Sequence, residues 1–178
     1  MRIQALAFLL FSSVLTPISV SAQQPAAPAA YPLDAIPDKM PFATPYGPPI
    51  SLSRAQAAIT AAQAEAEKRG WPLDIAVVDS GANLVAFARM DGAQLASIAI
   101  AEHKARAAAS FRRPTRVFEE AVQKVDFKFV LTLDDVIASR GGIPLIEDGK
   151  LIGAIGCSGG AGSQDEVVCA AGAATINK

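Results

Sequence analysis

The sequence is poor in the residues that metal centres and nucleic-acid interfaces need. It has one histidine, two cysteines, one tryptophan and two tyrosines in 178 residues, and 16 Lys and Arg nearly balance 17 Asp and Glu. A structural zinc site is therefore not expected. The near-neutral charge gives no electrostatic basis for binding nucleic acid or anionic lipid, and platforms for stacking bases are not expected either. No C-x-x-C-H motif is present, which excludes covalent attachment of c-type haem.

Long apolar runs are also scarce, and the one that stands out lies at the N-terminus. Residues 1–22 open with Arg2, continue through ALAFLLFSSVL and end with Val20 and Ala22 at the small-residue positions that signal peptidase reads. This pattern predicts a secretory signal peptide over 1–22, too short for a membrane anchor. We expect a periplasmic or secreted protein without a transmembrane segment.

Export bears on the two cysteines, Cys157 and Cys169. An oxidising compartment makes a disulfide between them the first candidate. Two small buried thiols are the alternative, because a sequence does not supply the Cα spacing that a disulfide needs.

Residues 23–50 hold eight of the twelve prolines and predict an extended N-terminal arm. Met40, Phe42, Tyr46 and Ile50 lie in its second half. These apolar side chains indicate that the second half lies on the domain or on a neighbouring subunit.

Turn, capping and alternation patterns predict an α+β domain over 51–178. We expect a helix over 51–70 with a capping box at Ser53 and Gln56 and its end at Gly70; a hairpin over 73–90; helices over 93–112 and from Thr115 to Lys124; a short strand or loop over 129–139; a hairpin over 141–160 turning at Asp148 and Gly149; and a helix capped by Ser163 and Glu166. Hairpins imply a central antiparallel sheet, flanked by the helices.

The helix over 93–112 is apolar on both sides yet carries charges in its middle. Such a helix is normally buried in a core or between subunits. Glu102 and Arg106 lie one turn apart and are expected to pair. Two interpretations of the only histidine, His103, stay open. It forms a hydrogen bond while Lys104 extends its ammonium to solvent, or it is an iron ligand or proton-transfer group at the edge of a pocket.

The junction after this helix leaves similar alternatives. Thr115 follows Pro114 and is either the N-cap of the next helix or a hydroxyl facing a pocket, or both. Arg112, Arg113 and Arg116 either are a solvated helix terminus or bind carboxylates. The glycine-rich stretch GCSGGAGSQDE is better explained as a turn and a helix cap than as an anion site, since its acidic residues would repel phosphate.

Three stretches, AVVDSGANLVAFARMDGA, EHKARAAASFRRPT and GGIPLIEDGKLIGAIGCSGGAGSQDE, resemble the GlcG/HbpS-like haem-binding family, which includes the C-terminal domain of PduO-type proteins. The likeness covers 51 to the C-terminus. The resemblance implies a profilin-like α+β layout, homo-oligomers that are often octamers, and non-covalent binding of haem or another tetrapyrrole such as a corrinoid. It also implies that Thr115 of the RRPT segment contacts haem and that Lys104 is the lysine of the KA motif.

These observations favour an exported, oligomeric haem- or tetrapyrrole-binding protein for sequestration or sensing. Iron would take His103, or more weakly Thr115, while Lys104, Arg106, Arg112 and Arg113 would hold the propionates. An enzyme acting on a small carboxylate or a haem-derived substrate is the alternative, with His103 or Asp79 as acid/base and with Lys104 and Arg106 binding the anion. A structural or partner-binding oligomer that acts through its proline-rich arm is the third possibility.

Overall fold

The structure is a computed structural model that describes residues 36, 38–40 and 42–177. The chain separates into two units, Met1–Asp38 and Lys39–Lys178, and the helices and strands described here lie in the second unit. The predicted signal peptide, 1–22, and the first part of the predicted arm lie outside the described residues.

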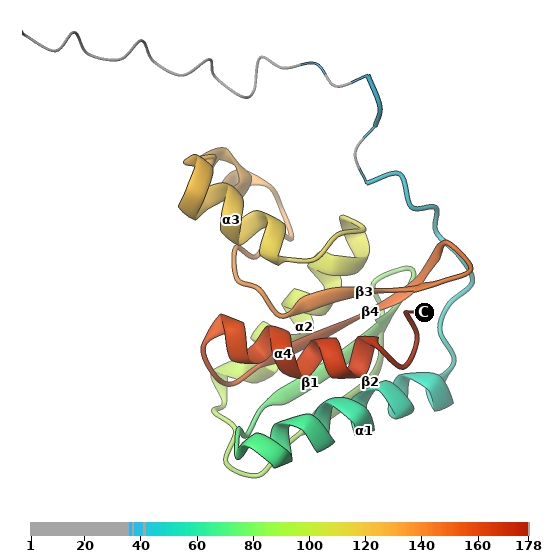
Figure 1. The fold of residues 1–178 in the computed structure, drawn as a ribbon, viewed down its shortest axis with the longest axis vertical. Helices are drawn as coiled ribbons and strands as arrows, with labels where there is room; N and C mark the ends of the chain where they lie inside the picture. Colours follow the sequence, from blue (N-terminus) through green and yellow to red (C-terminus); the bar gives the residue numbers. More distant parts are fainter. Residues whose placement is uncertain (1–35, 37, 41, 178) are drawn as a thin grey trace, which may run out of the picture. The chain divides into compact units, whose positions relative to one another are not determined.

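A four-stranded antiparallel sheet forms the centre of the domain (Figure 1). Its strands are β1 (Asp74–Asp79), β2 (Leu84–Arg89), β3 (Gly142–Glu147) and β4 (Lys150–Ser158), in the order β2-β1-β4-β3. The outer pairs are the two predicted hairpins, and the β1–β4 pairing joins them. The predicted α+β class, with a sheet built from hairpins, is therefore confirmed.

Turn chemistry explains why both hairpins close where they do. The carboxylate of Asp79 accepts the backbone N–H of Gly81 at 2.8 Å and that of Asn83 at 2.9 Å, a local bond that favours a turn. Asp148 and Gly149 have φ of 48° and 72°, which is the left-handed pair that a tight two-residue hairpin requires.

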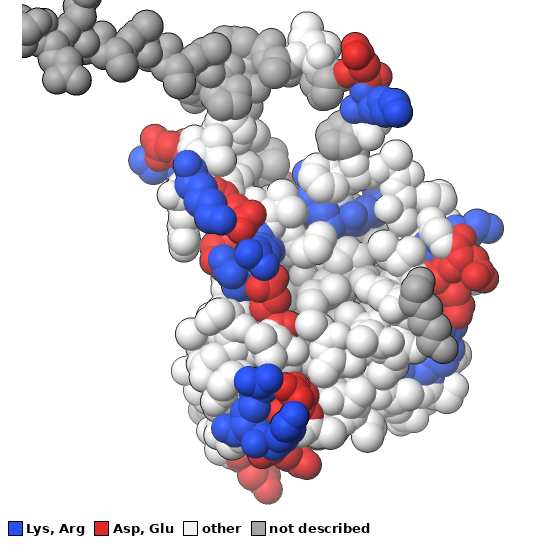
Figure 2. Space-filling view, in the orientation of Figure 1, with Lys and Arg blue, Asp and Glu red and all other residues white. Residues whose placement is uncertain are grey.

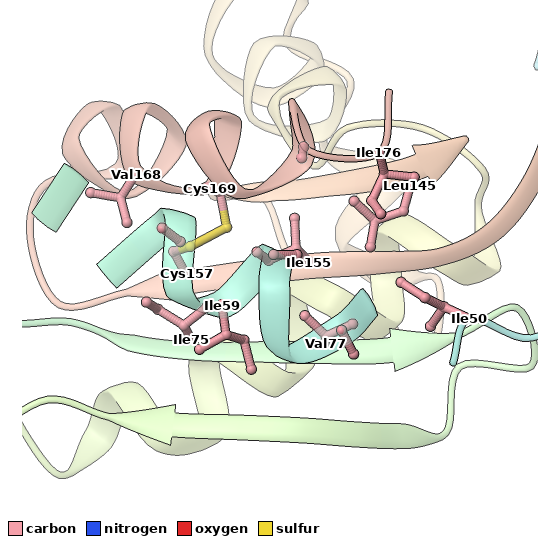
Figure 3. Packing of buried hydrophobic residues seen from close by; sticks show 14 of the residues in the cluster. Ile50, Ile59, Ile75, Val77, Leu145, Ile155, Cys157, Val168, Cys169 and Ile176 are labelled. Carbon is pink, nitrogen blue, oxygen red and sulfur yellow. A yellow bond between two sulfur atoms is a disulfide. The ribbon is translucent and has the colours of Figure 1, made fainter. Parts of the chain in front are cut away.

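Two helices, α1 (Leu52–Arg69) and α4 (Gly162–Ala173), cover one face of the sheet. Figure 3 shows the apolar core between them, where Ile59 of α1 lies near Ile75 of β1 and Val168 of α4 lies close by. Cys157 of β4 and Cys169 of α4 are joined by a disulfide in this core, with Cα atoms 5.6 Å apart. The structure thus adopts the first of the two alternatives for the cysteines, and the bond ties α4 to the sheet.

A single helix, α2 (Ala96–Ser110), packs on the opposite face, and glycines of the sheet allow its close approach. A Cβ atom added to Gly156 would lie 2.2 Å from the carbonyl oxygen of Ala101, and one added to Gly142 would lie 2.3 Å from that of Lys104. Since real Cβ contacts are never so short, any larger residue at either position would push the helix from the sheet. The alanines of α2 and the glycines of the β3–β4 hairpin are both small, and together they allow the helix to pack closely on the sheet.

Helix ends differ from the predictions. α1 begins at Leu52 after Ser51, and α4 begins at Gly162 after Ala161. Both predicted capping boxes are wrong, because Ser53 and Ser163 lie inside the first turn, where a side chain no longer reaches the cap position. The end of α1 is as predicted, since Gly70 takes φ of 68°. α2 is shorter than 93–112 at both ends.

The segment after α2 forms α3 (Arg116–Val125) and a 3-10 turn, η2 (Lys128–Thr132). A short strand or a loop was predicted over 129–139, and η2 occupies its beginning. Figure 1 shows α3 lying beyond the β3 side of the sheet. Within the described part of the chain, no helix combines the length and apolar character needed to cross a membrane.

Candidate functional site

Helix α2 has one side on the sheet and one side open. Ala101, Ala105 and Ala108 are fully buried in the core beneath it. On the other side, residues spaced three or four apart form a strip that the described chain covers only in part, and Leu95 on it is 71% exposed. We call this strip the outer stripe; its members are Leu95, Ala99, His103, Arg106 and Ser110. Burial on both sides, as predicted for this helix, is thus not completed by one chain.

His103 lies half-buried in the middle of the outer stripe. Its imidazole has no hydrogen bond or ion pair with any residue that the structure describes. The structure therefore gives no partner among the described residues for the internal hydrogen bond that one interpretation of His103 requires. Glu102 and Arg106 form the ion pair predicted one turn apart, so the charge of Arg106 is already compensated.

Lys104, the next residue, points into the protein. Its Nζ lies 2.7 Å from Oδ2 of Asp165 in α4, and the side chains are 1% and 3% exposed. Oδ1 of the same carboxylate accepts the N–H of Gly160 at 3.0 Å. The prediction that Lys104 extends to solvent is wrong, because a buried charge is held by its partner. Lys104 joins α2 to α4 and does not reach the surface to which a propionate or a small carboxylate would bind.

Thr115 is also interior, with no exposed surface. It stands at the N-cap position of α3, but its side chain makes no capping bond. Instead, its hydroxyl accepts the N–H of Gly142 at 2.9 Å, and its own N–H donates to the Gly142 carbonyl at 3.0 Å. Thr115 therefore ties the start of α3 to β3. A ligand on the surface of this chain reaches His103 but not Thr115, so Thr115 as an iron ligand stays a prediction that requires this bond to open.

Two neighbouring arginines follow the end of α2. The guanidinium of Arg113 lies 3.5 Å from the ring centre of Phe42, and that of Arg112 lies 5.3 Å from the ring of Tyr46. Nη1 of Arg112 also donates to the carbonyl of Thr44 at 3.0 Å. No carboxylate of the described residues pairs with either guanidinium. Burial lowers the pKa of Arg113, and the positive charge of Arg112 lowers it further.

These contacts place the second half of the proline-rich arm on the domain. Ile50 is buried in the core, and Phe42 and Tyr46 cover the arginines. Met40 is 81% exposed. Of the four apolar residues in that half, three therefore contact the domain of their own chain.

A shallow hollow of about 290 Å³ lies beside the arginines. Tyr46 and Ser110 line one part of it, and the β1–β2 turn lines the rest with Ser80, Gly81 and Ala82. The hydroxyl of Tyr46 donates to the carbonyl of Ser110 at 2.7 Å, which links the hollow to the end of the outer stripe. At about 300 Å³, a hollow is at the lower limit of small-molecule pockets. A whole macrocycle would therefore lie over it, not within it.

Other arginines of this region are already neutralised. Arg116 lies 3.1 Å from Glu120 and 3.4 Å from Glu166, and Arg140 lies 2.6 Å from Glu119. Burial would raise the pKa of Glu119, but its hydrogen bonds to Arg140 outweigh this and lower the pKa. Figure 2 shows the same mixing of basic and acidic side chains over α3. Arg116 is thus part of an ion-pair network, unlike Arg112 and Arg113.

Two aspartates, Asp79 and Asp74, differ in how their carboxylates are bonded. Asp79, the alternative acid/base, is engaged in the β1–β2 turn through Gly81 and Asn83. Asp74, which sequence reasoning did not single out, is fully buried at the start of β1, and neither carboxylate oxygen has a hydrogen-bond partner among the described residues. Burial raises the pKa of Asp74, and the charge of Arg89 opposes this only in part.

Sequence reasoning also missed Asp165 as the partner of Lys104, and Tyr46 as a contact of Arg112. Asp165 lies 61 residues from Lys104, so no local pattern connects them. For Tyr46 the sequence did hold a weak signal, because an aromatic residue in a proline-rich arm indicates that the arm packs on a surface. The stretch GCSGGAGSQDE is a turn and a cap, as predicted, but Gln164 caps it by accepting the Ala161 N–H at 2.9 Å.

Comparison with known proteins agrees with this fold. The model of a family described as "Haem degrading protein HbpS-like" matches residues 50–174. Protein GlcG of Escherichia coli strain K12 is 42% identical over 109 residues, which are 61% of this chain and 81% of that protein.

Solved structures are similar as well. A double mutant of HbpS from Streptomyces reticuli superposes with a TM-score of 0.68 at 30% identity, covering 85% of this chain and all of that one (100%). A structure described as a PduOC:heme complex superposes with a TM-score of 0.65 at 28% identity, covering 72% and 96%. The family match spans most of the chain, and the sheet and helices agree with it. This chain belongs to the GlcG/HbpS-like family.

Proposed function

We propose that this protein binds haem, or a related tetrapyrrole, non-covalently on the outer stripe of α2 and the arginine pair at its end. The proposal rests on two observations in one segment: His103 on α2 has no partner among the described residues, and Arg112 and Arg113, which follow the end of the same helix, have no carboxylate partner there. An imidazole can bind the central iron of haem, and guanidiniums can bind the two propionates on one edge of the macrocycle.

The residues present fit the group. Haem is a flat apolar macrocycle with an iron ion and two propionates. Leu95 and Ala99 offer exposed apolar contact along the stripe, and His103 would hold the iron. At a rise of 1.5 Å per residue, the end of α2 lies about 10 Å from His103 along the helix axis. Arg112 and Arg113 follow that end and would hold the propionates, since guanidinium matches carboxylate in geometry and charge.

The comparisons support this proposal without deciding the ligand. The matching family is described by haem degradation, and one structural relative is described as a haem complex. A corrinoid is the alternative ligand, because its macrocycle and amide or carboxylate side chains would need similar contacts. The chemistry that bound haem supplies is a redox-active iron; what this chain supplies is the surface, the imidazole and the cations.

We also propose that the protein acts as an exported homo-oligomer. The outer stripe leaves Leu95 71% exposed, and a second copy of the chain packed over it, with the ligand between the two copies, would complete the burial that the helix pattern predicts. An octamer is the assembly that the resemblance implies. The predicted signal peptide supports a periplasmic or secreted location.

Haem degradation is the second candidate, favoured by the description of the matching family. His103 is the titratable group on the outer stripe that is left without a partner in the described chain, so it is the candidate group for holding or moving a proton there. Loss of the Soret band over time in the presence of ascorbate and oxygen, abolished in His103→Ala, would favour degradation over sequestration.

The test is an absorbance titration of the purified mature protein with haemin. We expect a saturable Soret shift, a different band position in His103→Ala, and weaker binding with an unchanged band in the Arg112→Gln, Arg113→Gln double variant. Arg116→Gln is the matched control, because Arg116 is already paired with Glu120. The absence of a saturable shift, or a shift unaltered by all these changes and by Thr115→Val, would remove the proposal.

A further inference from the structure

The arginine pair that would hold the propionates is covered by the chain itself. Residues 42–46, which we call the strap, lie over it: Phe42 stacks on Arg113, and the carbonyl of Thr44 and the ring of Tyr46 contact Arg112. In each of these contacts the partner of the guanidinium is an uncharged group, either a carbonyl or an aromatic ring. The Thr44 carbonyl thus takes an N–H of Arg112 that a carboxylate would bind, and Phe42 covers one face of the Arg113 guanidinium.

The two ends of the strap are held differently. From Pro45 onward the backbone is bonded to β4: the Leu151 N–H donates to the Pro45 carbonyl at 2.8 Å, and the Gly47 N–H donates to the Leu151 carbonyl at 2.7 Å. Residues 42–44 make no backbone hydrogen bond of this kind with the described strands. They contact the domain through the two arginines. The strap is therefore held by backbone bonds to β4 from Pro45 onward and by the arginine contacts over residues 42–44.

Backbone strain is present on both sides of this contact. Phe42 has φ of 58° and Arg112 has φ of 54°, although neither is glycine. Left-handed backbone is unfavourable for such residues and persists where surrounding contacts enforce it, often in clamps and switches. The left-handed φ of Arg112 belongs to the end of α2, where the Arg113 N–H donates to the Ala108 carbonyl at 3.2 Å and the Arg112 N–H donates to the Ala109 carbonyl at 3.2 Å. Releasing the strap would therefore relax Phe42, and the covered state is held by the arginine contacts against this local cost.

We propose that residues 42–44, the first part of the strap, are displaceable, and that a ligand bearing two carboxylates binds Arg112 and Arg113 by taking their place. A guanidinium bonds a carboxylate more strongly than it bonds a carbonyl or an aromatic face. Haem with its two propionates displaces the strap, whereas a neutral macrocycle leaves it in place. That the ligand is haem rests on the function proposed above. That residues 42–44 cover the arginines is independent of that function.

Two variants at one position test the strap in the full mature protein. Phe42→Ala removes the stack on Arg113 and is expected to bind haemin about three- to ten-fold more tightly, the range of one cation–π contact. Phe42→Trp strengthens the stack and is expected to bind haemin more weakly than wild type. Haemin dimethyl ester, which lacks free carboxylates, is expected to bind wild type and both variants equally. Phe129→Ala, an aromatic change in η2, is the matched control.

A second readout needs no haem. Phenylglyoxal modifies accessible guanidiniums, and peptide mass spectrometry gives the rate at Arg113. We expect a several-fold faster rate in Phe42→Ala than in wild type, with circular dichroism showing both folded. Equal rates in the two proteins overturn the strap, as does weaker haemin binding by Phe42→Ala, which would make Phe42 a ligand contact. If no protein binds haemin, the proposed function fails, and the modification rates still decide on the strap.

Discussion

Lys104 in α2 and Asp165 in α4 form an ion pair in the interior, with 2.7 Å between Nζ and Oδ2 and almost no exposed surface on either side chain. The two helices lie on opposite faces of the sheet, so this pair connects the faces beside Gly141, just before the start of β3. Residues of two of the quoted motifs thereby serve the fold. Among the described residues, His103 on the open side of α2 and Arg112 and Arg113 after its end have no acidic partner.

Breaking this pair on one side should be costly. Lys104→Met leaves the Asp165 carboxylate buried without its partner, and we expect a loss of about 3–5 kcal/mol in the free energy of unfolding. The Lys104→Met, Asp165→Leu double variant should recover most of it. Urea unfolding followed by circular dichroism measures both. A single variant as stable as wild type would show that the pair does not support the fold.

The buried carboxyl of Asp74 makes the stability of the protein depend on pH. Burial raises its pKa in the folded state, so the folded state prefers the neutral carboxyl and loses stability as pH rises from the unfolded pKa through the folded one. Asp74→Asn removes the cost of the buried charge and should unfold at a higher temperature than wild type at neutral pH. Thermal melts from pH 4 to pH 8 should show the gap between variant and wild type widening with pH. A constant gap contradicts the assignment.

Thr115 offers a test that separates fold from ligand binding. Thr115→Val keeps the shape but loses the acceptor for the Gly142 N–H, and we expect about 1–3 kcal/mol of destabilisation. Thr115→Ser keeps the hydroxyl and should lose less. If Thr115 acts only in the fold, the Soret position with haemin stays unchanged in Thr115→Val. A moved band would make Thr115 an iron ligand after all.

Gly156 limits how closely α2 can approach the sheet. Gly156→Ala places a methyl group 2.2 Å from the Ala101 carbonyl oxygen, so α2 has to shift and we expect a loss of at least about 1–3 kcal/mol. Gly149→Ala is a useful comparison: no atom lies within 4 Å there, but φ of 72° strains any larger residue. A thermal melt of Gly156→Ala that equals wild type would contradict the packing.

The fold was largely predictable from local signals. Alternating apolar residues and the turns at Asp79–Asn83 and Asp148–Gly149 fix both hairpins, because strand period and turn type are properties of a few neighbouring residues. Helix starts were less predictable. Ser53 and Ser163 have the side chains of caps, yet α1 and α4 begin before them, since packing on the sheet outweighs about 1 kcal/mol of capping.

The site was predictable in its residue types but not in its arrangement. His103, Arg112 and Arg113 were all singled out from the sequence. That Lys104 turns inward depends on Asp165, 61 residues away, and that Arg112 is covered depends on Thr44, 68 residues away. Contacts at such separations depend on the topology of the fold, and the periodicity of residues within one helix does not predict them.

Anomalous scattering can locate the iron in crystals of the mature protein grown with haemin. We expect iron at bonding distance from the imidazole of His103 on the outer stripe, with propionate oxygens on Arg112 and Arg113 and residues 42–44 displaced. Iron bound elsewhere, with His103 free and the arginines still covered by Phe42 and Thr44, would contradict the proposal.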